Sequence, residues 1–266
     1  MIKLLVGGAC GRMGGRIIHL ALKDPDFRLT GVFETSKHPG VGTSLSKFLG
    51  GAHADLSVEG GLEKVIEKGD VLIDFTSPEA TPENLCRCIE HKKAIVIGTT
   101  GLPEETLQLV EQAAKKIPIV QSPNMSLGVN LLFRLTELVA MKLGDDYDIE
   151  IVEAHHRNKK DSPSGTALEL ARRAARERDL DPGKAFVYGR EGLTGVRDNR
   201  TIGIHAVRGG DVIGEHTVSF LSEGERIELV HKASSRDAFA KGALLAAKFL
   251  ADKKKGLFTM QQVLGL

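Results

Sequence analysis

A cluster of polar and cationic residues in the middle of the chain could bind an anion. Segment 155–166 reads His-His-Arg-Asn-Lys-Lys-Asp-Ser-Pro-Ser-Gly-Thr and follows a predicted strand. Ser162 is a candidate helix N-cap and Pro163 suits the first helical position. Gly165 and Thr166 would then lie in the first helical turn. Their backbone N–H groups and the Thr166 hydroxyl would present an anion with the positive end of the helix dipole.

Proton-transfer groups stand beside this expected anion site. His155 and His156 directly follow a predicted strand, and Lys159 comes shortly after them. Together with the helix start, Lys159 and a histidine predict a pocket for a small substrate with one or two carboxylates. A histidine in that pocket could also transfer protons near neutral pH. The alternative is a solvated, charged loop before a routine helix. Adjacent histidines make a poor zinc site, since neighbouring strand side chains point to opposite faces and no third ligand is apparent. We therefore expect no metal ion.

A second candidate site lies near the N-terminus. Between a predicted strand and a predicted helix lies the run Gly8-Ala9-Cys10-Gly11-Arg12-Met13-Gly14. The spacing is G-x-x-G-x-x-G instead of G-x-G-x-x-G, because Cys10 interrupts the usual pattern. Small residues still allow a sharp turn and a close approach of the backbone to a pyrophosphate at the helix N-terminus. The run therefore predicts a dinucleotide site.

Glu34 supports this prediction. It ends the second predicted strand about twenty residues past Gly14, where an acidic side chain hydrogen-bonds the adenosine ribose. The alternative is a solvated acid at a strand end. Thr35 follows, where a site that prefers NADPH would favour an arginine, although Arg12 and Lys37 could supply that charge. The sequence thus favours NADH and leaves use of NADPH open.

Three further polar turns follow predicted strands in the first half of the chain. Ligands of open α/β sheets bind beyond the carboxyl ends of the strands. We therefore expect the last two turns to border the nicotinamide half of the cofactor and the first to share their rim, although each could be only a polar turn. The turns are Asp74-Phe75-Thr76, Gly98-Thr99-Thr100-Gly101 and Ser122-Pro123-Asn124-Met125-Ser126.

Strands and helices alternate along the first half of the chain. This order predicts βαβ units and a Rossmann-like, doubly wound parallel sheet covered on both faces. The fully apolar strands suit burial in such a sheet. The expected strands are 2–6, 29–34, 71–75, 94–97 and 117–120, and the expected helices are 14–22, 62–68, 82–91 and 103–116.

The pattern changes after about residue 126. A helix over 127–141, a strand over 148–154 and a helix over 163–178 precede three strands in sequence, at 201–207, 212–221 and 226–230. Turn residues between those strands predict an antiparallel meander. The second half is thus an α+β domain with a mixed, largely antiparallel sheet. A last helix over 237–251 has Asp237 as its candidate N-cap.

Composition narrows the class of protein. The chain has 266 residues, 41% hydrophobic and 27% charged, which suits one large domain or two modest ones. A net charge of +1 argues against a nucleic-acid binder. The odd number and wide spacing of Cys10, Cys86 and Cys88 argue against disulfides and favour the cytoplasm. Because no apolar stretch approaches about 18 residues, we expect no membrane span.

These motifs together resemble one enzyme family nearly from end to end. The chain is similar to 4-hydroxy-tetrahydrodipicolinate reductase, also called dihydrodipicolinate reductase, of the bacterial diaminopimelate–lysine pathway. The segment Glu153-Ala154-His155-His156-Arg157, followed by Pro163-Ser164-Gly165-Thr166-Ala167, is highly specific for it. The other matching segments are 11–14, 73–76, 96–101 and 231–236.

The resemblance implies a fold and an activity. It implies a dinucleotide-binding domain over 1–126 that the C-terminal helix within 236–266 rejoins, and a substrate-binding and oligomerisation domain over 127–235 that forms a homotetramer. In the implied reaction water leaves the hydroxylated ring, a hydride from NADH or NADPH reaches C4, and a proton adds at the neighbouring carbon. The product is tetrahydrodipicolinate.

The resemblance also implies roles for individual residues. It assigns His155 as the acid/base, Lys159 as a second proton-handling or carboxylate-binding group, and His156, Gly165 and Thr166 as holders of the dicarboxylate. The implied cofactor contacts are Gly8, Ala9, Cys10, Gly11, Arg12, Met13, Glu34, Gly98, Thr99, Thr100, Ser122, Pro123, Asn124 and Met125. Two departures from the family pattern are Cys10, where glycine is frequent, and Thr35, where arginine is frequent.

Two other classes of protein compete with this interpretation. A redox sensor or scaffold would bind a dinucleotide without chemistry, and it would not need the cluster that contains His155 and Lys159. A semialdehyde dehydrogenase would need a nucleophilic cysteine in its substrate region, whereas all three cysteines precede residue 90.

Overall fold

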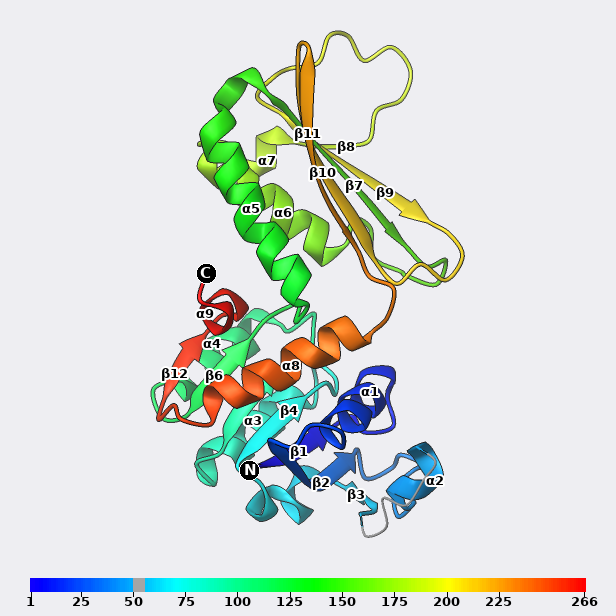
Figure 1. Ribbon diagram of the computed structural model, residues 1–266, viewed down its shortest axis with the longest axis vertical. Helices are drawn as coiled ribbons and strands as arrows, with labels where there is room; N and C mark the ends of the chain where they lie inside the picture. Colours follow the sequence, from blue (N-terminus) through cyan, green and yellow to red (C-terminus); the bar gives the residue numbers. More distant parts are fainter. Residues whose placement is uncertain (50–55) are drawn as a thin grey trace. The chain divides into compact units, whose positions relative to one another are not determined.

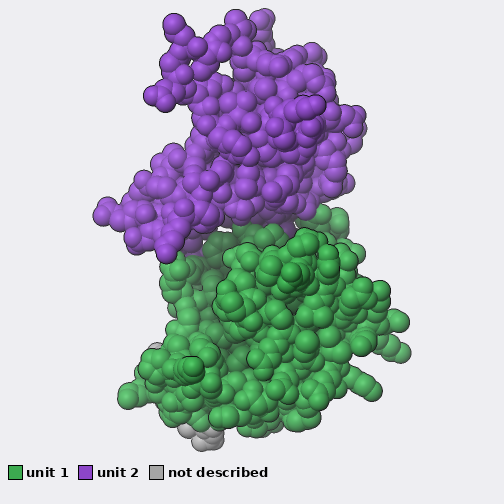
Figure 2. Space-filling model, turned by 180° about the vertical axis from the view of Figure 1, so that it is seen from behind, with its two compact units in different colours: residues 1–127, 236–266 green, residues 128–235 purple. Residues whose placement is uncertain are grey.

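The computed structural model describes residues 1–49 and 56–266 and divides the chain into two compact units (Figures 1 and 2). Unit 1 comprises residues 1–127 and 236–266, and unit 2 comprises residues 128–235. The chain thus leaves unit 1, builds unit 2 from one continuous segment, and returns to unit 1 with its last residues.

Unit 1 is built on a seven-stranded sheet in the order β12-β6-β5-β4-β1-β2-β3. All of its strand pairings are parallel. Every residue of β4 and β5 is buried, as expected for strands covered on both faces. The strands are β1 (Ile2–Gly7), β2 (Phe27–Glu34), β3 (Val58–Gly60), β4 (Val71–Asp74), β5 (Ala94–Ile97), β6 (Pro118–Gln121) and β12 (Gly256–Phe258).

Helices cover both faces of this sheet (Figure 1). Leu4 and Val6 belong to a core that includes residues of α1 and α8, whereas Leu5 between them belongs to a core that includes residues of α3 and α4. This alternation along β1 follows from the two-residue period of a strand. The helices are α1 (Arg12–Ala21), α2 (Leu45–Leu49), α3 (Thr81–Glu90), α4 (Glu104–Ala113), α8 (Asp237–Leu250) and α9 (Met260–Leu264). The predicted doubly wound parallel sheet is confirmed.

Two local predictions for unit 1 were wrong. Residues 62–68 form two short 3-10 turns, Leu62–Lys64 and Ile66–Lys68, instead of one helix. Val65 between them has a non-helical backbone, and its buried side chain lies directly against Gly31 of β2. Tertiary packing thus outweighs the local helical pattern.

The C-terminal segment was also only partly predicted. Arg236 is the N-cap of α8, and Asp237 is its first residue and forms an ion pair with Arg16 at 2.6 Å. Asp237 therefore binds a guanidinium of α1 instead of capping its own helix. Residues 236–266 are not a single helix, because β12 adds a parallel edge strand beside β6 and α9 follows it.

Unit 2 contains a five-stranded mixed sheet in the order β11-β10-β7-β9-β8. Strand β10 pairs antiparallel with β11 and β7, and β9 pairs parallel with β7 and β8. Of the predicted meander, the antiparallel pair β10–β11 is confirmed, but its first pairing was wrong, because β7 lies between β9 and β10. Unit 2 is built from α5 (Leu127–Leu143), β7 (Asp148–His155), α6 (Gly165–Glu177), α7 (Pro182–Ala185), β8 (Phe186–Tyr188), β9 (Ile202–Arg208), β10 (Glu215–Ser222) and β11 (Glu225–Lys232).

The two faces of the unit 2 sheet differ. Ile149 and Ile151 of β7 are buried in a core with residues of α5 and α6. Alternate residues point the other way, and Val152 of β7, Val207 of β9 and Val230 of β11 are exposed. No described helix of either unit is long and apolar enough to cross a membrane.

Candidate active site

The glycine-rich segment forms a tight turn at the carboxyl end of β1. Gly8 has φ of 73°, and a Cβ there would lie 2.5 Å from the Phe75 carbonyl oxygen. A Cβ at Gly14 would collide with the carbonyl oxygen of Gly8. Only glycine allows both approaches. Gly11 is the N-cap of α1 and has no side chain to cap it, so the helix start can present backbone N–H groups to an anion.

Glu34 is hydrogen-bonded to this turn. Its Oε1 accepts a hydrogen bond from the backbone N–H of Cys10 at 2.8 Å. A cavity of about 530 Å³ opens beside the pair, a size typical of small-molecule sites. Its lining includes Gly8, Cys10, Gly11, Glu34, Thr35, His38, Phe75, Thr76, Asn84 and Arg87. Four of the predicted cofactor residues therefore share one cavity.

Other predicted cofactor residues lie outside that lining. Ala9 and Met125 are buried in the core of unit 1, and Met13 packs against it. The remaining ones are Arg12, Gly98, Thr99, Thr100, Ser122, Pro123 and Asn124, of which Gly98 to Thr100 follow β5 and Ser122 to Asn124 follow β6. The loops after β5 and β6 therefore share one rim of the sheet, as predicted for the carboxyl ends of parallel strands.

Asp74 organises the neighbouring strand end. The carboxylate is fully buried and accepts hydrogen bonds from the Thr76 N–H at 2.9 Å, the Thr76 hydroxyl at 2.6 Å and the Asn84 amide at 3.3 Å. Burial raises the pKa of Asp74, and these hydrogen bonds only partly oppose that effect. Asp74 thus fixes Thr76 and Asn84, which line the cavity, without lining it itself.

In unit 2, a buried carboxylate joins the predicted histidine to the start of α6. Glu153 has no solvent exposure, and its Oε2 lies 2.6 Å from His155 Nδ1. Its Oε1 accepts the backbone N–H of Ser164 at 2.9 Å. The Arg208 guanidinium donates to both oxygens, at 2.7 and 2.8 Å. Burial alone would raise the pKa of Glu153, but these four hydrogen bonds outweigh it and lower the pKa to about 2.

Sequence analysis did not identify Glu153 and Arg208 as parts of this site. Glu153 precedes His155 by two positions on the same strand, so the strand period alone places them on one face. That signal was available from sequence. Arg208 comes from β9, where it is paired with His155 only through the register of the β7–β9 ladder. No local pattern indicates that pairing.

The start of α6 differs from the prediction by two residues. Ser164, and not Ser162, is the N-cap, because its hydroxyl accepts the Ala167 N–H while its own N–H is held by Glu153. Pro163 therefore precedes the helix instead of beginning it, whereas Gly165 and Thr166 lie in the first helical turn, as predicted. The Ser164 hydroxyl also lies 3.2 Å from His216 Nε2. Hydrogen bonds therefore link His155, Glu153 and the N-terminus of α6 to His216.

Histidine is concentrated around this helix start. The rings of His155 and His216 meet edge to face, with centroids 5.3 Å apart. Burial, reinforced by the charge of His155, lowers the pKa of His216 to about 3, so His216 is neutral at pH 7. Buried Nδ1 atoms of His156 and His216 have no hydrogen-bond partner among the described residues. Buried polar atoms of this kind are normally satisfied by water or a ligand.

Lys159 is held by a neighbouring acid. Its Nζ lies 2.9 Å from an Asp161 carboxylate oxygen, and the Asp161 carbonyl accepts Arg208 at 2.8 Å. A glycine also borders the site, since a Cβ at Gly214 would lie 3.1 Å from His155 Nε2. Nδ1 of His155 is thus committed to Glu153, while Nε2 faces the small residue Gly214.

Comparison with known proteins assigns the chain to a family. A family profile described as dihydrodipicolinate reductase, N-terminus, matches residues 2–125, and its C-terminal counterpart matches residues 128–264. The chain belongs to the dihydrodipicolinate reductase family. The resemblance inferred from the motifs is confirmed, as is the interpretation of the chain as a reductase.

Relatives match over their whole length. A 4-hydroxy-tetrahydrodipicolinate reductase of Syntrophus aciditrophicus is 46% identical over 265 residues, covering 100% of this chain and 99% of the relative. The corresponding protein of Syntrophotalea carbinolica is 48% identical over 266 residues, with all of both chains covered. The solved structure of a dipicolinate-bound dihydrodipicolinate reductase from Paenisporosarcina sp. TG-14 is 29% identical, with a TM-score of 0.77 and 98% of each chain covered.

Proposed function

We propose that this chain reduces 4-hydroxy-tetrahydrodipicolinate to tetrahydrodipicolinate with NADH, in diaminopimelate and lysine biosynthesis. The observation that carries this proposal is the pairing of His155 with buried Glu153 at the N-terminus of α6, in a chain that belongs to the reductase family. Unit 1 binds the dinucleotide and unit 2 the substrate. The three free cysteines suit a cytoplasmic location.

Unit 1 fits a dinucleotide in three respects. Glycines at 8 and 14 allow the close turn, the uncapped start of α1 offers N–H groups to a pyrophosphate, and Glu34 stands at the cavity wall for a ribose hydroxyl. When bound, the nicotinamide supplies the hydride. The loops after β5 and β6, which hold Gly98 to Thr100 and Ser122 to Met125, position its ring.

We propose that Glu34 makes NADH the preferred cofactor. A 2′-phosphate on the ribose would bring negative charge against this carboxylate. Arg87 is the one cation among the described residues that line the cavity, and it faces Glu83 at 3.7 Å and Glu90 at 3.9 Å. We expect kcat/KM to be about tenfold higher with NADH, which corresponds to about 1.4 kcal/mol.

In unit 2, Glu153 keeps a proton on Nδ1 of His155 and stabilises the doubly protonated ring. Nε2 of His155 then donates a proton to the ring carbon next to the one that receives the hydride. Lys159, His156 and the first N–H groups of α6, at Gly165 and Thr166, bind the two carboxylates and stabilise the negative charge that develops on the substrate.

The exposed face of the unit 2 sheet supports a further proposal, a homotetramer. Val152 of β7, Val207 of β9 and Val230 of β11 are exposed on that face, with β10 between β7 and β11. Exposed apolar surface of this kind marks association sites. The solution mass of the purified chain, measured by light scattering, tests this; a monomer would refute it.

The reaction is tested with the full chain, NADH and substrate made in situ by the synthase that produces it. We expect loss of NADH absorbance only when the substrate is present, and slower loss with NADPH at equal concentration. Dipicolinate should inhibit in competition with the substrate and not with NADH. No oxidation of either cofactor at any substrate concentration would refute the proposed reaction.

A further inference from the structure

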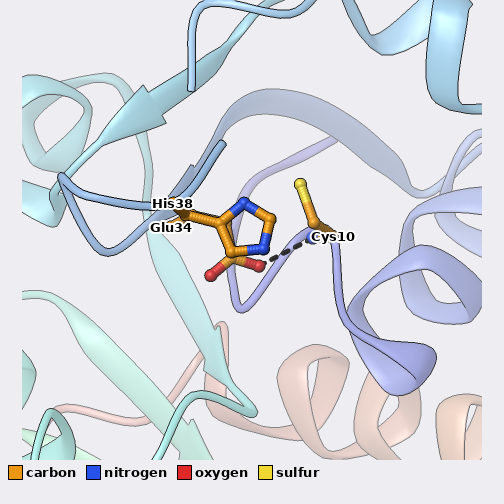
Figure 3. Close-up of side chains that lie close together, drawn as sticks. All are labelled: Cys10, Glu34 and His38. Atoms are coloured by element: carbon orange, nitrogen blue, oxygen red, sulfur yellow. Dashed lines mark hydrogen bonds between the residues drawn. The ribbon is translucent and has the colours of Figure 1, made fainter. Parts of the chain in front are cut away.

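Three potential metal ligands converge at the wall of the unit 1 cavity (Figure 3). Cys10 lies in the turn after β1, Glu34 ends β2, and His38 follows in the next turn. Their ligand atoms, one from each side chain, all lie within 4.8 Å of one another, and all three residues are partly buried. Among the described residues, no other group of three His, Cys, Asp or Glu side chains meets this geometry.

The chemistry of this ligand set is selective. Thiolate, imidazole and carboxylate together suit Zn²⁺ and similar thiophilic ions, whereas Mg²⁺ and Ca²⁺ prefer oxygen ligands alone. Bonds of about 2.0 to 2.3 Å to one ion put tetrahedral ligands roughly 3.5 Å apart. Side-chain rotations that bring the three ligand atoms, now within 4.8 Å of one another, to this spacing would complete a three-ligand site with water in the fourth position.

Two existing hydrogen bonds set the expected affinity. The backbone N–H of Cys10 donates a hydrogen bond to Oε1 of Glu34 at 2.8 Å, which holds this ligand in place before an ion binds. His38 Nδ1 accepts the Gly40 N–H at 3.0 Å, so a metal at either ring nitrogen must weaken that bond. A cysteine binds a metal ion as the thiolate, and an ordinary thiol is mostly protonated at pH 7. Binding an ion must release that proton, so we expect moderate affinity.

We propose that Cys10, Glu34 and His38 bind a thiophilic divalent cation of the Zn²⁺ type, and that the bound cation and the dinucleotide exclude each other. The exclusion rests on the proposed function, because it assumes that Glu34 contacts the ribose. A carboxylate that ligates a metal is no longer oriented toward a hydroxyl, and the ion and its water would occupy the same cavity. The site would make reductase activity sensitive to free zinc.

Binding is tested by titrating the metal-free full chain with Co²⁺, which reports on its ligands by colour. We expect a near-ultraviolet thiolate-to-cobalt charge-transfer band, tetrahedral visible bands, and release of about one proton per ion. Zn²⁺ should bleach both bands. Cys10→Ser should lose the charge-transfer band, while Cys86→Ser, at an exposed cysteine outside the cavity, should keep it. No band with the unsubstituted chain, or a band that survives Cys10→Ser, overturns the site.

The exclusion has a separate test. NADH added to the cobalt-loaded chain should remove the charge-transfer band as the dinucleotide displaces the ion. In the reductase assay Zn²⁺ should raise the KM for NADH with little change in kcat, and His38→Ala should lessen this inhibition at least tenfold. A band that persists at saturating NADH overturns the exclusion. Turnover by the chelator-treated chain measures the proposed reaction independently of any metal.

Discussion

Glu153→Gln tests how unit 2 holds its catalytic histidine. The two carboxylate oxygens receive four hydrogen bonds, from His155, from Ser164 and twice from Arg208. A glutamine offers one oxygen and one NH₂ group, so whichever way it points two of the four donors meet another donor. Arg208 is then only half paired. If the NH₂ group replaces Oε2, Nδ1 of His155 must become an acceptor, and if it replaces Oε1, the Ser164 N–H loses its acceptor.

The size of the effect follows from the pKa. Lowering the pKa of Glu153 from an ordinary 4.5 to about 2 corresponds to about 3 kcal/mol of folding free energy. Because the folded-state pKa is depressed, this stabilisation is complete above about pH 4.5 and is lost as the pH falls toward 2. Without a carboxylate the tautomer and the charged form of His155 are no longer stabilised, which should in addition lower kcat on the order of 10²- to 10⁴-fold.

Both effects are measurable with one pair of variants. Urea unfolding at pH 7 should show a loss of about 3 kcal/mol for Glu153→Gln, and a smaller loss at pH 3.5. Glu150→Gln is the matched control, because Glu150 lies on the same strand, binds Arg190 and Arg197, and also has its pKa lowered to about 2, by hydrogen bonds that outweigh its burial. Glu150→Gln should lose stability but keep kcat. A folded Glu153→Gln enzyme with kcat within twofold of the parent would refute the positioning role.

Other substitutions test the cofactor site of unit 1 and the substrate site of unit 2 separately. His155→Ala should lose most turnover, at least about 10²-fold, while NADH affinity measured by fluorescence titration stays near that of the parent; unchanged turnover would contradict its role. Glu34→Ala should raise the Kd for NADH several-fold with little change in saturated kcat, and an unchanged Kd would place the ribose elsewhere. Gly14→Ala should abolish NADH binding, because its Cβ collides with Gly8; retained affinity would refute the tight-turn argument. Gly214→Ala should lower kcat by crowding His155 Nε2, and parental kcat would show that Nε2 is not the reacting atom.

Much of unit 1 could be predicted from local patterns. The fully apolar run at 94–97 became β5 with the predicted bounds, since a strand buried on both faces needs little context. The helix predicted over 14–22 is α1, which begins two residues earlier, at Arg12. Strand β12 could not be predicted, because three residues carry no period, and they become a strand only by pairing with β6.

Prediction failed where distant segments had to meet. Nothing near residues 201–230 indicates that β7 separates β9 from β10, and this insertion brings Arg208 and His216 to Glu153. The cluster of Cys10, Glu34 and His38 was missed for the same reason, since it depends on the parallel register of β1 and β2. Contacts between residues that are distant in the sequence cannot be predicted from local sequence patterns.

The return of residues 236–266 to unit 1 affects the order of assembly during synthesis. Unit 2 is a continuous stretch that can fold as soon as residue 235 has left the ribosome. Until the end of the chain is released, β6 has no strand on its outer side, and α8 is missing from the face that it covers beside α1. An unfinished chain would therefore display an unprotected sheet edge and a bare apolar surface, both of which favour aggregation. Truncations near residue 236, which lack both α8 and β12, should be captured by chaperones even though every residue assigned to catalysis has already been made.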